Sequence, residues 1–333
     1  MRIHLLHAIV FFIISVAPAQ AAESLGTGLR RIEFTDPVGH GPVDAVAFYP
    51  AAEATSSTHP GPFEVAASKG VSIASGRYPL FLMSHGSLGS LWGNHDLATF
   101  LTRHGAIVVS VTHPGDNFQD ASRVSSSLAV FGRAMQISAA LTAALNDPFL
   151  AQHIDPGRIG FVGFSAGGTT GLILAGAKPD FARLVAYCKG RTQDRVVCEA
   201  RGQIRRERPD IGPVPDDRIR SFALLAPLSV VFSPEALRPV TAPLSVFVGD
   251  KDEELSPRDN ALDLARGLGN RTELHVIENA GHFTFLAPCT AEFMREMPAL
   301  CADRPEIDRV ALHRSVNADI ARFFDSTLGR SPQ

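Results

Sequence analysis

Short apolar runs that end in turn residues alternate along the chain with segments of helical periodicity. The runs typical of buried strands cover 78–86, 106–116, 158–165, 220–228, 242–250 and 272–279. Apolar positions recur at helical intervals between them, at 95–105, 126–147, 166–176, 257–267 and 305–326. Two earlier segments, 29–36 and 43–50, favour an antiparallel strand pair. The alternation predicts an α/β protein with a mostly parallel central sheet and helices on both faces.

Two stretches depart from this rhythm. Residues 51–78 are rich in Ala, Ser, Gly and Pro and are predicted to form a long surface connection. Residues 179–218 are polar and contain two of the cysteines, which favours an inserted cap. We expect residues 22–333 to form one domain that carries this insertion.

The amino-terminal residues have the features of an export signal. Arg2 precedes an apolar run from about 8 to 17, and Ala19-Gln20-Ala21 provides the small residues that a signal peptidase requires. Because the apolar run is short for a bilayer, we interpret 1–21 as a cleaved signal peptide. A retained membrane anchor is the alternative. The mature protein is then expected in the periplasm or outside the cell, without a stable membrane anchor.

Export changes the interpretation of the four cysteines. An even number in an oxidising compartment indicates disulfides, and proximity in sequence favours Cys188–Cys198 and Cys289–Cys301. Free thiols in a cytosolic protein are the competing interpretation. The cysteine spacing does not resemble a zinc site.

Composition excludes few classes of protein but limits the binding partners that we expect. The chain has 333 residues, of which 45% are hydrophobic, enough for a sizeable core. A formal net charge of −3 gives no reason to expect nucleic acid or an anionic membrane as the main partner. The histidines are scattered and no Gly-rich nucleotide loop follows the first strands, so no metal or organic cofactor is expected.

Ser165 lies where a predicted strand meets a predicted helix, in the segment GFSAGG at 163–168. Small residues at such a point can simply form a tight turn. The pattern G-x-S-x-G in this context is also typical of a nucleophile elbow, in which the glycines expose the serine oxygen. Since ligands bind at the carboxyl ends of parallel strands, we expect Ser165 to be a catalytic nucleophile.

Partners for Ser165 follow two later strands in the required order of acid and then base. His282, on a loop beyond the last strand, is the predicted base. Asp252 is the favoured acid, and Asp250 is the alternative because an aspartate at that position could instead hold the turn. The remaining carboxylates of this loop are expected to face solvent.

An oxyanion formed by the reaction would need N–H donors. The backbone N–H groups of Ala166, after the nucleophile, and of Ser87, in the loop after an early strand, are the candidates. His85 in that loop is expected to pack and hydrogen-bond beneath it. Candidate substrate contacts from the same sheet edge, for which ordinary packing is the alternative, are Leu88, Trp92, His113 and Phe283.

The motifs SHGSLG, GFSAGG, GDKDE and GHF together resemble the α/β-hydrolase superfamily. With HPGDN at 113–117, GRAMQISAAL at 132–141 and GHFTFLAPC at 281–289, the chain is similar to exported dienelactone hydrolase-like and platelet-activating-factor acetylhydrolase-like esterases over about 30–326. Dienelactone hydrolases proper use a cysteine nucleophile, whereas this chain has Ser165. The resemblance therefore implies a serine carboxylesterase.

The combined prediction is a monomeric hydrolase that cleaves a small-molecule ester through an acyl-enzyme. A thioesterase, lactonase, amidase or lipid-ester hydrolase would use the same residues. A non-catalytic binding protein on the same fold is a further alternative, against which the complete Ser–Asp–His set argues. Acyl length and leaving group depend on the pocket formed near 179–218 and 114–130, which spacing does not reveal.

Overall fold

A computed structural model describes residues 25–329, apart from 192–193 and 195–196. The predicted signal peptide, residues 1–21, lies outside the described residues. The strands form one sheet in the order β3-β1-β2-β5-β4-β6-β7-β8-β9. Their bounds are β1 (Gly26–Thr35), β2 (Pro42–Ala51), β3 (Ser68–Lys69), β4 (Tyr78–Ser84), β5 (Ile107–Val111), β6 (Ile154–Phe164), β7 (Ser221–Leu225), β8 (Leu244–Gly249) and β9 (Thr272–Ile277).

The sheet contains two antiparallel pairs toward one end and is otherwise parallel. β1 pairs antiparallel with β2, and β2 pairs antiparallel with β5. From β5 through β4 and on to β9, every neighbouring pair is parallel. The carboxyl ends of these strands therefore share one edge, where loops can bring distant residues together.

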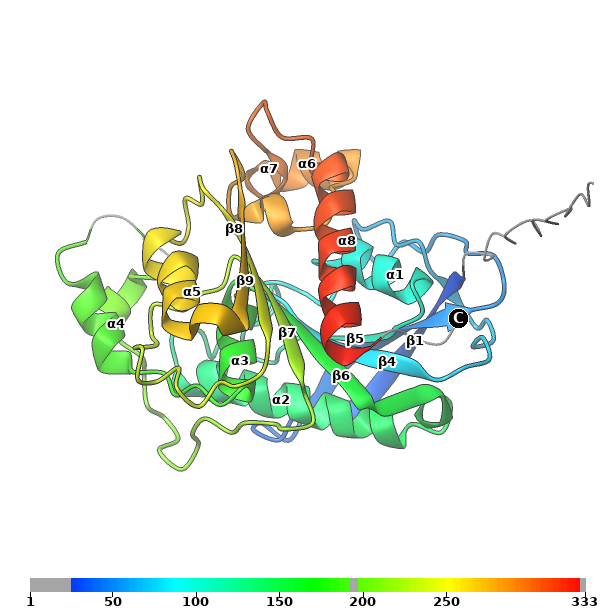
Figure 1. Ribbon diagram of the computed structural model, residues 1–333, viewed down its shortest axis with the longest axis horizontal. Coiled ribbons are helices and arrows are strands. Elements are labelled where there is room, and N and C mark those ends of the chain that lie inside the picture. Colours follow the sequence, from blue (N-terminus) through cyan, green and yellow to red (C-terminus); the bar gives the residue numbers. More distant parts are fainter. Residues whose placement is uncertain (1–24, 192–193, 195–196, 330–333) are drawn as a thin grey trace, which may run out of the picture.

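Helices cover both faces of the sheet. α1 and α8 pack against one face, and α2 and α3 pack against the other (Figure 1). α5 joins α2 and α3 in the same apolar cluster. The helices are α1 (His95–Arg103), α2 (Ser127–Asn146), α3 (Ala166–Leu174), α4 (Phe181–Cys188), α5 (Asp263–Leu268), α6 (Ala291–Glu296), α7 (Pro298–Cys301) and α8 (Arg309–Leu328).

The apolar runs of the sequence account for the centre of the sheet. All residues of β4, β5, β7 and β8 are buried, as expected for strands covered on both faces. β9 differs because it is an edge strand, and Leu274 and Val276 are exposed on it.

Several segments differ from the sequence-based expectation. The helix expected at 305–326 begins only at Arg309, because Asp308 caps it by accepting a hydrogen bond from Ala311 N. The helix expected at 257–267 starts as a π-helical turn (Arg258–Leu262) before α5. The predicted surface connection 51–78 contains the short strand β3, which pairs with β1.

Residues 179–218, the predicted cap, lie between α3 and β7 and contain α4 and a 3-10 turn (Glu199–Gly202). This segment is tied to the loop before α2, since Arg205 N donates to Ser125 O and Ser127 N donates to Arg205 O. It also reaches the loop after β8, where Ser256 N donates to Asp194 Oδ1 at 3.0 Å.

Candidate active site

Ser165 occupies a strained turn between β6 and α3. Its φ is +54°, a left-handed conformation that is uncommon for a residue with a side chain. Its N–H donates to Leu225 O at 2.9 Å, which holds the turn against the end of β7. A β-carbon on Gly163 would overlap Gly167 O, and a β-carbon on Gly167 would overlap Ser84 O. The glycines of the G-x-S-x-G pattern are thus required by close backbone approach.

His282 and Asp252 meet Ser165 at the carboxyl edge of the sheet. His282 Nε2 lies 3.0 Å from Ser165 Oγ, and His282 Nδ1 lies 2.8 Å from Asp252 Oδ2. The side chains of His282 and Asp252 are only 4% and 1% exposed. The other carboxylate oxygen of Asp252 accepts hydrogen bonds from Leu255 N at 2.7 Å and Glu254 N at 3.0 Å. Such an arrangement can orient an imidazole and pass a proton to or from the serine.

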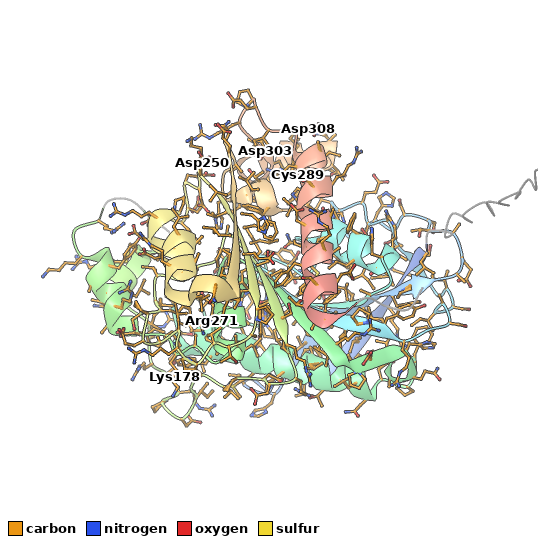
Figure 2. All side chains as sticks on the ribbon, viewed as in Figure 1. Lys178, Asp250, Arg271, Cys289, Asp303 and Asp308 are labelled. Atoms are coloured by element: carbon orange, nitrogen blue, oxygen red, sulfur yellow. A yellow bond between two sulfur atoms is a disulfide. The ribbon has the colours of Figure 1, made fainter. Side chains whose placement is uncertain are left out.

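Asp250, the alternative acid, has a different role in this loop. Its Oδ1 accepts a hydrogen bond from Asn279 N at 2.7 Å, and its Oδ2 lies 2.7 Å from Lys251 Nζ. Figure 2 shows Asp250 at the end of the molecule where α8 begins, as expected for a residue after β8. Asp250 therefore joins the loops after β8 and β9, while Asp252 contacts His282.

Glu254 departs from the expectation that the remaining carboxylates face solvent. It is half-buried, whereas Glu253 is exposed. Burial raises the pKa of Glu254, against the opposing effect of the His282 charge. The number of acidic residues in the loop gave no sign of this difference.

The loop that carries His282 is anchored by side chains from the carboxyl-terminal part of the chain. Thr284 Oγ1 accepts a hydrogen bond from Gly281 N at 3.1 Å and donates to Asp303 Oδ1 at 2.8 Å. Arg309 forms a buried ion pair with Asp303 at 2.7 Å. These contacts fix the backbone on both sides of the histidine.

The two candidate oxyanion donors flank Ser165. Ala166 is the first residue of α3, so its N–H points from the positive end of the helix. A β-carbon on Gly86 would lie 3.2 Å from Ser165 Cβ, which places the loop of Ser87 beside Ser165. Within residues 25–329 as described, neither the Ser87 N–H nor the Ala166 N–H donates to a protein acceptor. Both groups are thus available to a bound oxygen.

The predicted substrate contacts separate into two groups. Leu88 is 48% exposed next to Ser87, and the Phe283 ring lies edge-on to His282 with centroids 5.2 Å apart. Trp92 instead packs against Phe48 and lines a cavity of about 400 Å³ over β1 and β2, which β5 and β4 separate from β6.

The expectation for His113 needs correction. Its side chain is fully buried, its Nε2 accepts from Ser84 Oγ at 2.8 Å, and its Nδ1 donates to Gln136 Oε1 at 2.7 Å. Burial and the charge of Arg133 lower its pKa well below the ordinary value. Both ring nitrogens already have partners, so His113 supports the loop from below and does not face a substrate.

His85 lies beneath its loop, as the sequence analysis expected. Its Nδ1 donates to Gly86 O at 2.6 Å, and its Nε2 accepts from His113 N at 3.1 Å. Burial, together with the Arg133 charge, lowers the pKa of His85 to about 3. The ring is therefore neutral and structural.

Asp116 and Arg133, which were not among the predicted site residues, form a buried ion pair under the same loop. Asp116 follows a buried strand at the edge of the sheet where Ser165 lies, and Arg133 interrupts an apolar helix. These two sequence positions indicated that each residue carries a buried charge, but they did not indicate that the two residues pair with each other.

The structure also contains the two expected cysteine pairings. Cys188 is joined to Cys198 beside α4, and Cys289 is joined to Cys301 beside α7. Two disulfides are consistent with an exported protein.

Comparison with known proteins gives the fold a name. No protein-family model matches the chain, and a search of curated proteins finds no match. A ferulic acid esterase from Streptomyces cinnamoneus is 18% identical, with 96% of this chain and 94% of that chain covered and a TM-score of 0.64. A dienelactone hydrolase from Anabaena variabilis ATCC 29413 is 16% identical, with 90% of this chain and 98% of that chain covered and a TM-score of 0.51. The chain therefore has the α/β-hydrolase fold.

Proposed function

We propose that the protein is a serine hydrolase that cleaves carboxylic esters through an acyl-enzyme. The observation that carries the proposal is the hydrogen-bonded chain from Ser165 Oγ through His282 to Asp252. These hydrogen bonds lie at the carboxyl ends of the strands, and they are flanked by the N–H groups of Ser87 and Ala166, which have no protein acceptor among the described residues. Nucleophile, base, orienting acid and oxyanion donors are the groups that acyl transfer needs.

In the proposed reaction, Ser165 Oγ attacks the ester carbonyl while His282 Nε2 takes the hydroxyl proton. The carbonyl oxygen becomes an oxyanion, which the N–H groups of Ser87 and Ala166 stabilise by about 3 kcal/mol each. When the oxyanion collapses, the bond to the alkoxy oxygen breaks and His282 delivers the proton to the leaving alcohol. His282 then deprotonates a water that attacks the acyl-enzyme, and the acid leaves as Ser165 regains its proton. Asp252 keeps the imidazole in the orientation that both steps require.

We infer that the substrate is a small-molecule ester. The two structural neighbours are named as a ferulic acid esterase and a dienelactone hydrolase, which act on ester or lactone bonds according to those names. Leu88 and Phe283 would provide an apolar wall beside the nucleophile.

We further propose that the protein acts as an exported monomer, with a cap formed by residues 179–218.

A fluorophosphonate probe tests the proposal directly. We expect the wild-type protein to be labelled at Ser165 and to hydrolyse p-nitrophenyl acetate, and we expect Ser165→Ala to abolish both. Ser326→Ala is the matched control, since this serine lies on α8 and its Oγ donates to Phe323 O within the same helix. Absence of labelling in folded wild-type protein would exclude a serine hydrolase. A series of p-nitrophenyl esters of rising acyl length, together with methyl ferulate, then defines the acyl group.

A further inference from the structure

A buried ion pair lies directly beneath the loop that carries Ser87. Arg133 Nη1, on α2, contacts Asp116 Oδ2 at 2.7 Å, and the two side chains are 3% and 5% exposed. Burial alone would raise the pKa of Asp116, but the Arg133 charge and the hydrogen bonds from Leu88, Ser87 and Arg133 together outweigh it and lower that pKa. Both groups are therefore charged in a place where unpaired charges would be costly. The proposed reaction uses neither of them directly.

The second oxygen of Asp116 holds the loop itself. Asp116 Oδ1 accepts from Ser87 Oγ at 2.7 Å and from Leu88 N at 2.9 Å. Gly89 N donates to Gly86 O and closes a turn, in which Leu88 has a φ of +56°. A leucine resists this conformation unless its surroundings impose it. Because Asp116 accepts the hydrogen bond from Leu88 N, that N–H group cannot also bind a substrate oxygen. Among the described residues the Ser87 N–H has no protein acceptor and remains the donor beside Ser165.

The remaining N–H groups of Arg133 extend the contact to the other side of the nucleophile. Its Nη2 donates to His85 O and, at 3.3 Å, to Ser84 Oγ. Its Nε donates to Thr170 Oγ1 at 3.3 Å, and Thr170 lies on α3. Thr170 Oγ1 in turn donates to Ala166 O at 3.2 Å. One planar guanidinium thus contacts the loop of Ser87 directly and is linked through Thr170 to the first turn of the helix that begins at Ala166.

We propose that Asp116 and Arg133 are positioning residues that fix the Ser87 N–H relative to the Ala166 N–H, and so set the geometry of the oxyanion site. The inference rests on the proposed esterase function. Oxyanion donors act through their placement on an atom that becomes charged only during the reaction. Because a rigid fork of five donors can hold several acceptors at fixed separations, arginine suits this role better than lysine.

Asp116→Asn is the first test, with p-nitrophenyl acetate as substrate. The amide keeps one oxygen for the Ser87 and Leu88 donors but presents an NH₂ group to Arg133. We expect kcat to fall about 10- to 100-fold, with KM within about twofold and with the midpoint of the kcat/KM pH profile unchanged because His282 is untouched. Labelling by a fluorophosphonate should slow in parallel with kcat. A wild-type kcat, or a loss confined to KM, would overturn the proposal.

Asp216→Asn is the matched control. The Asp216 carboxylate is similarly buried and pairs at 2.6 Å with Arg218, whose side chain is 40% exposed, but it precedes β7 and therefore lies at the opposite edge of the sheet. We expect this variant to lose stability and to keep the wild-type kcat. An equal fall in kcat for Asp216→Asn would show that the loss of any ion pair at a buried carboxylate slows the enzyme, which would also overturn the proposal.

Two further variants test whether the loss of kcat arises from lost positioning. One keeps the charge of Arg133, and the other removes the unpaired charge that could prevent folding. Arg133→Lys keeps the ion pair but cannot hold His85 O and Thr170 together, so we expect folded protein with reduced kcat; a wild-type kcat would refute the role of Arg133. If the single variants do not fold, Asp116→Leu/Arg133→Met removes both charges at once, a change that buried pairs often tolerate. That double variant should fold with reduced kcat, and wild-type turnover would contradict the inference. Failure of the wild-type protein to be labelled at Ser165 would instead refute the proposed function.

Discussion

Replacing Asp252 by asparagine should remove most of the activity while leaving the fold intact. The oxygen that accepts from Leu255 N and Glu254 N can be retained by the amide oxygen of asparagine. The amide NH₂ must then take the place of Oδ2, which now lies 2.8 Å from His282 Nδ1. Two donors would face each other unless the imidazole changes tautomer and carries its proton on Nε2. In that form Nε2 donates toward Ser165 and cannot accept the serine proton.

Loss of the correct tautomer costs about 10⁴-fold in kcat in a serine protease triad, which corresponds to about 5 kcal/mol of transition-state stabilisation. We expect a loss of that order here, measured as kcat/KM for p-nitrophenyl acetate near neutral pH. Circular dichroism should show a melting transition close to that of the wild-type protein, since the loop hydrogen bonds persist.

Asp250→Asn is the control that makes this test decisive. Its amide oxygen can still accept from Asn279 N, and no contact of Asp250 reaches His282 within the described part of the chain. We expect activity within about threefold of the wild type, in line with a surface change. The reasoning fails if Asp252→Asn retains more than about a tenth of the activity, or if Asp250→Asn loses as much as Asp252→Asn.

Two further predictions concern stability. Gly163→Ala should destabilise the protein by about 1–3 kcal/mol because the new β-carbon would overlap Gly167 O. Gly212 has open space around it, so Gly212→Ala should change the unfolding free energy by less than about 0.5 kcal/mol. Equal melting temperatures for the two variants would contradict this prediction. Burial alone would raise the pKa of Asp96, but the charge and hydrogen bond of His313, whose Nδ1 lies 2.6 Å away, act together with His95 and Asn317 and hold that pKa at about 2, below the ordinary 3.8. A lowered pKa stabilises the folded state above about pH 4 and ceases to do so as the pH falls toward 2, so urea unfolding should show the difference between wild type and Asp96→Asn shrinking by about 2 kcal/mol over that window. A difference that stays constant with pH would refute it.

The pattern of the sequence predicted which residues reach the catalytic edge, because strand ends can be located from apolar runs that stop at turn residues. Ser165 and His282 follow β6 and β9 in this way, and the structure brings them within hydrogen-bond distance. The choice between Asp250 and Asp252 could not be settled, since both follow β8 and spacing does not reveal where a carboxylate points. The structure distinguishes them, because Asp250 accepts a hydrogen bond from Asn279 N whereas Asp252 contacts His282.

His113 shows why the same reasoning fails for side chains that lie one layer deeper. Like His282, it follows the carboxyl end of a parallel strand, so its sequence position is comparable. The difference comes from α2, which supplies Gln136 as a partner for the imidazole and Arg133 as a partner for Asp116. A polar residue within an apolar helix indicates that a buried polar partner exists, but the identity of that partner depends on how the helix packs on the sheet. Ser165 and His282 could thus be predicted from strand ends, while the residues that hold their loops in place follow only from tertiary packing.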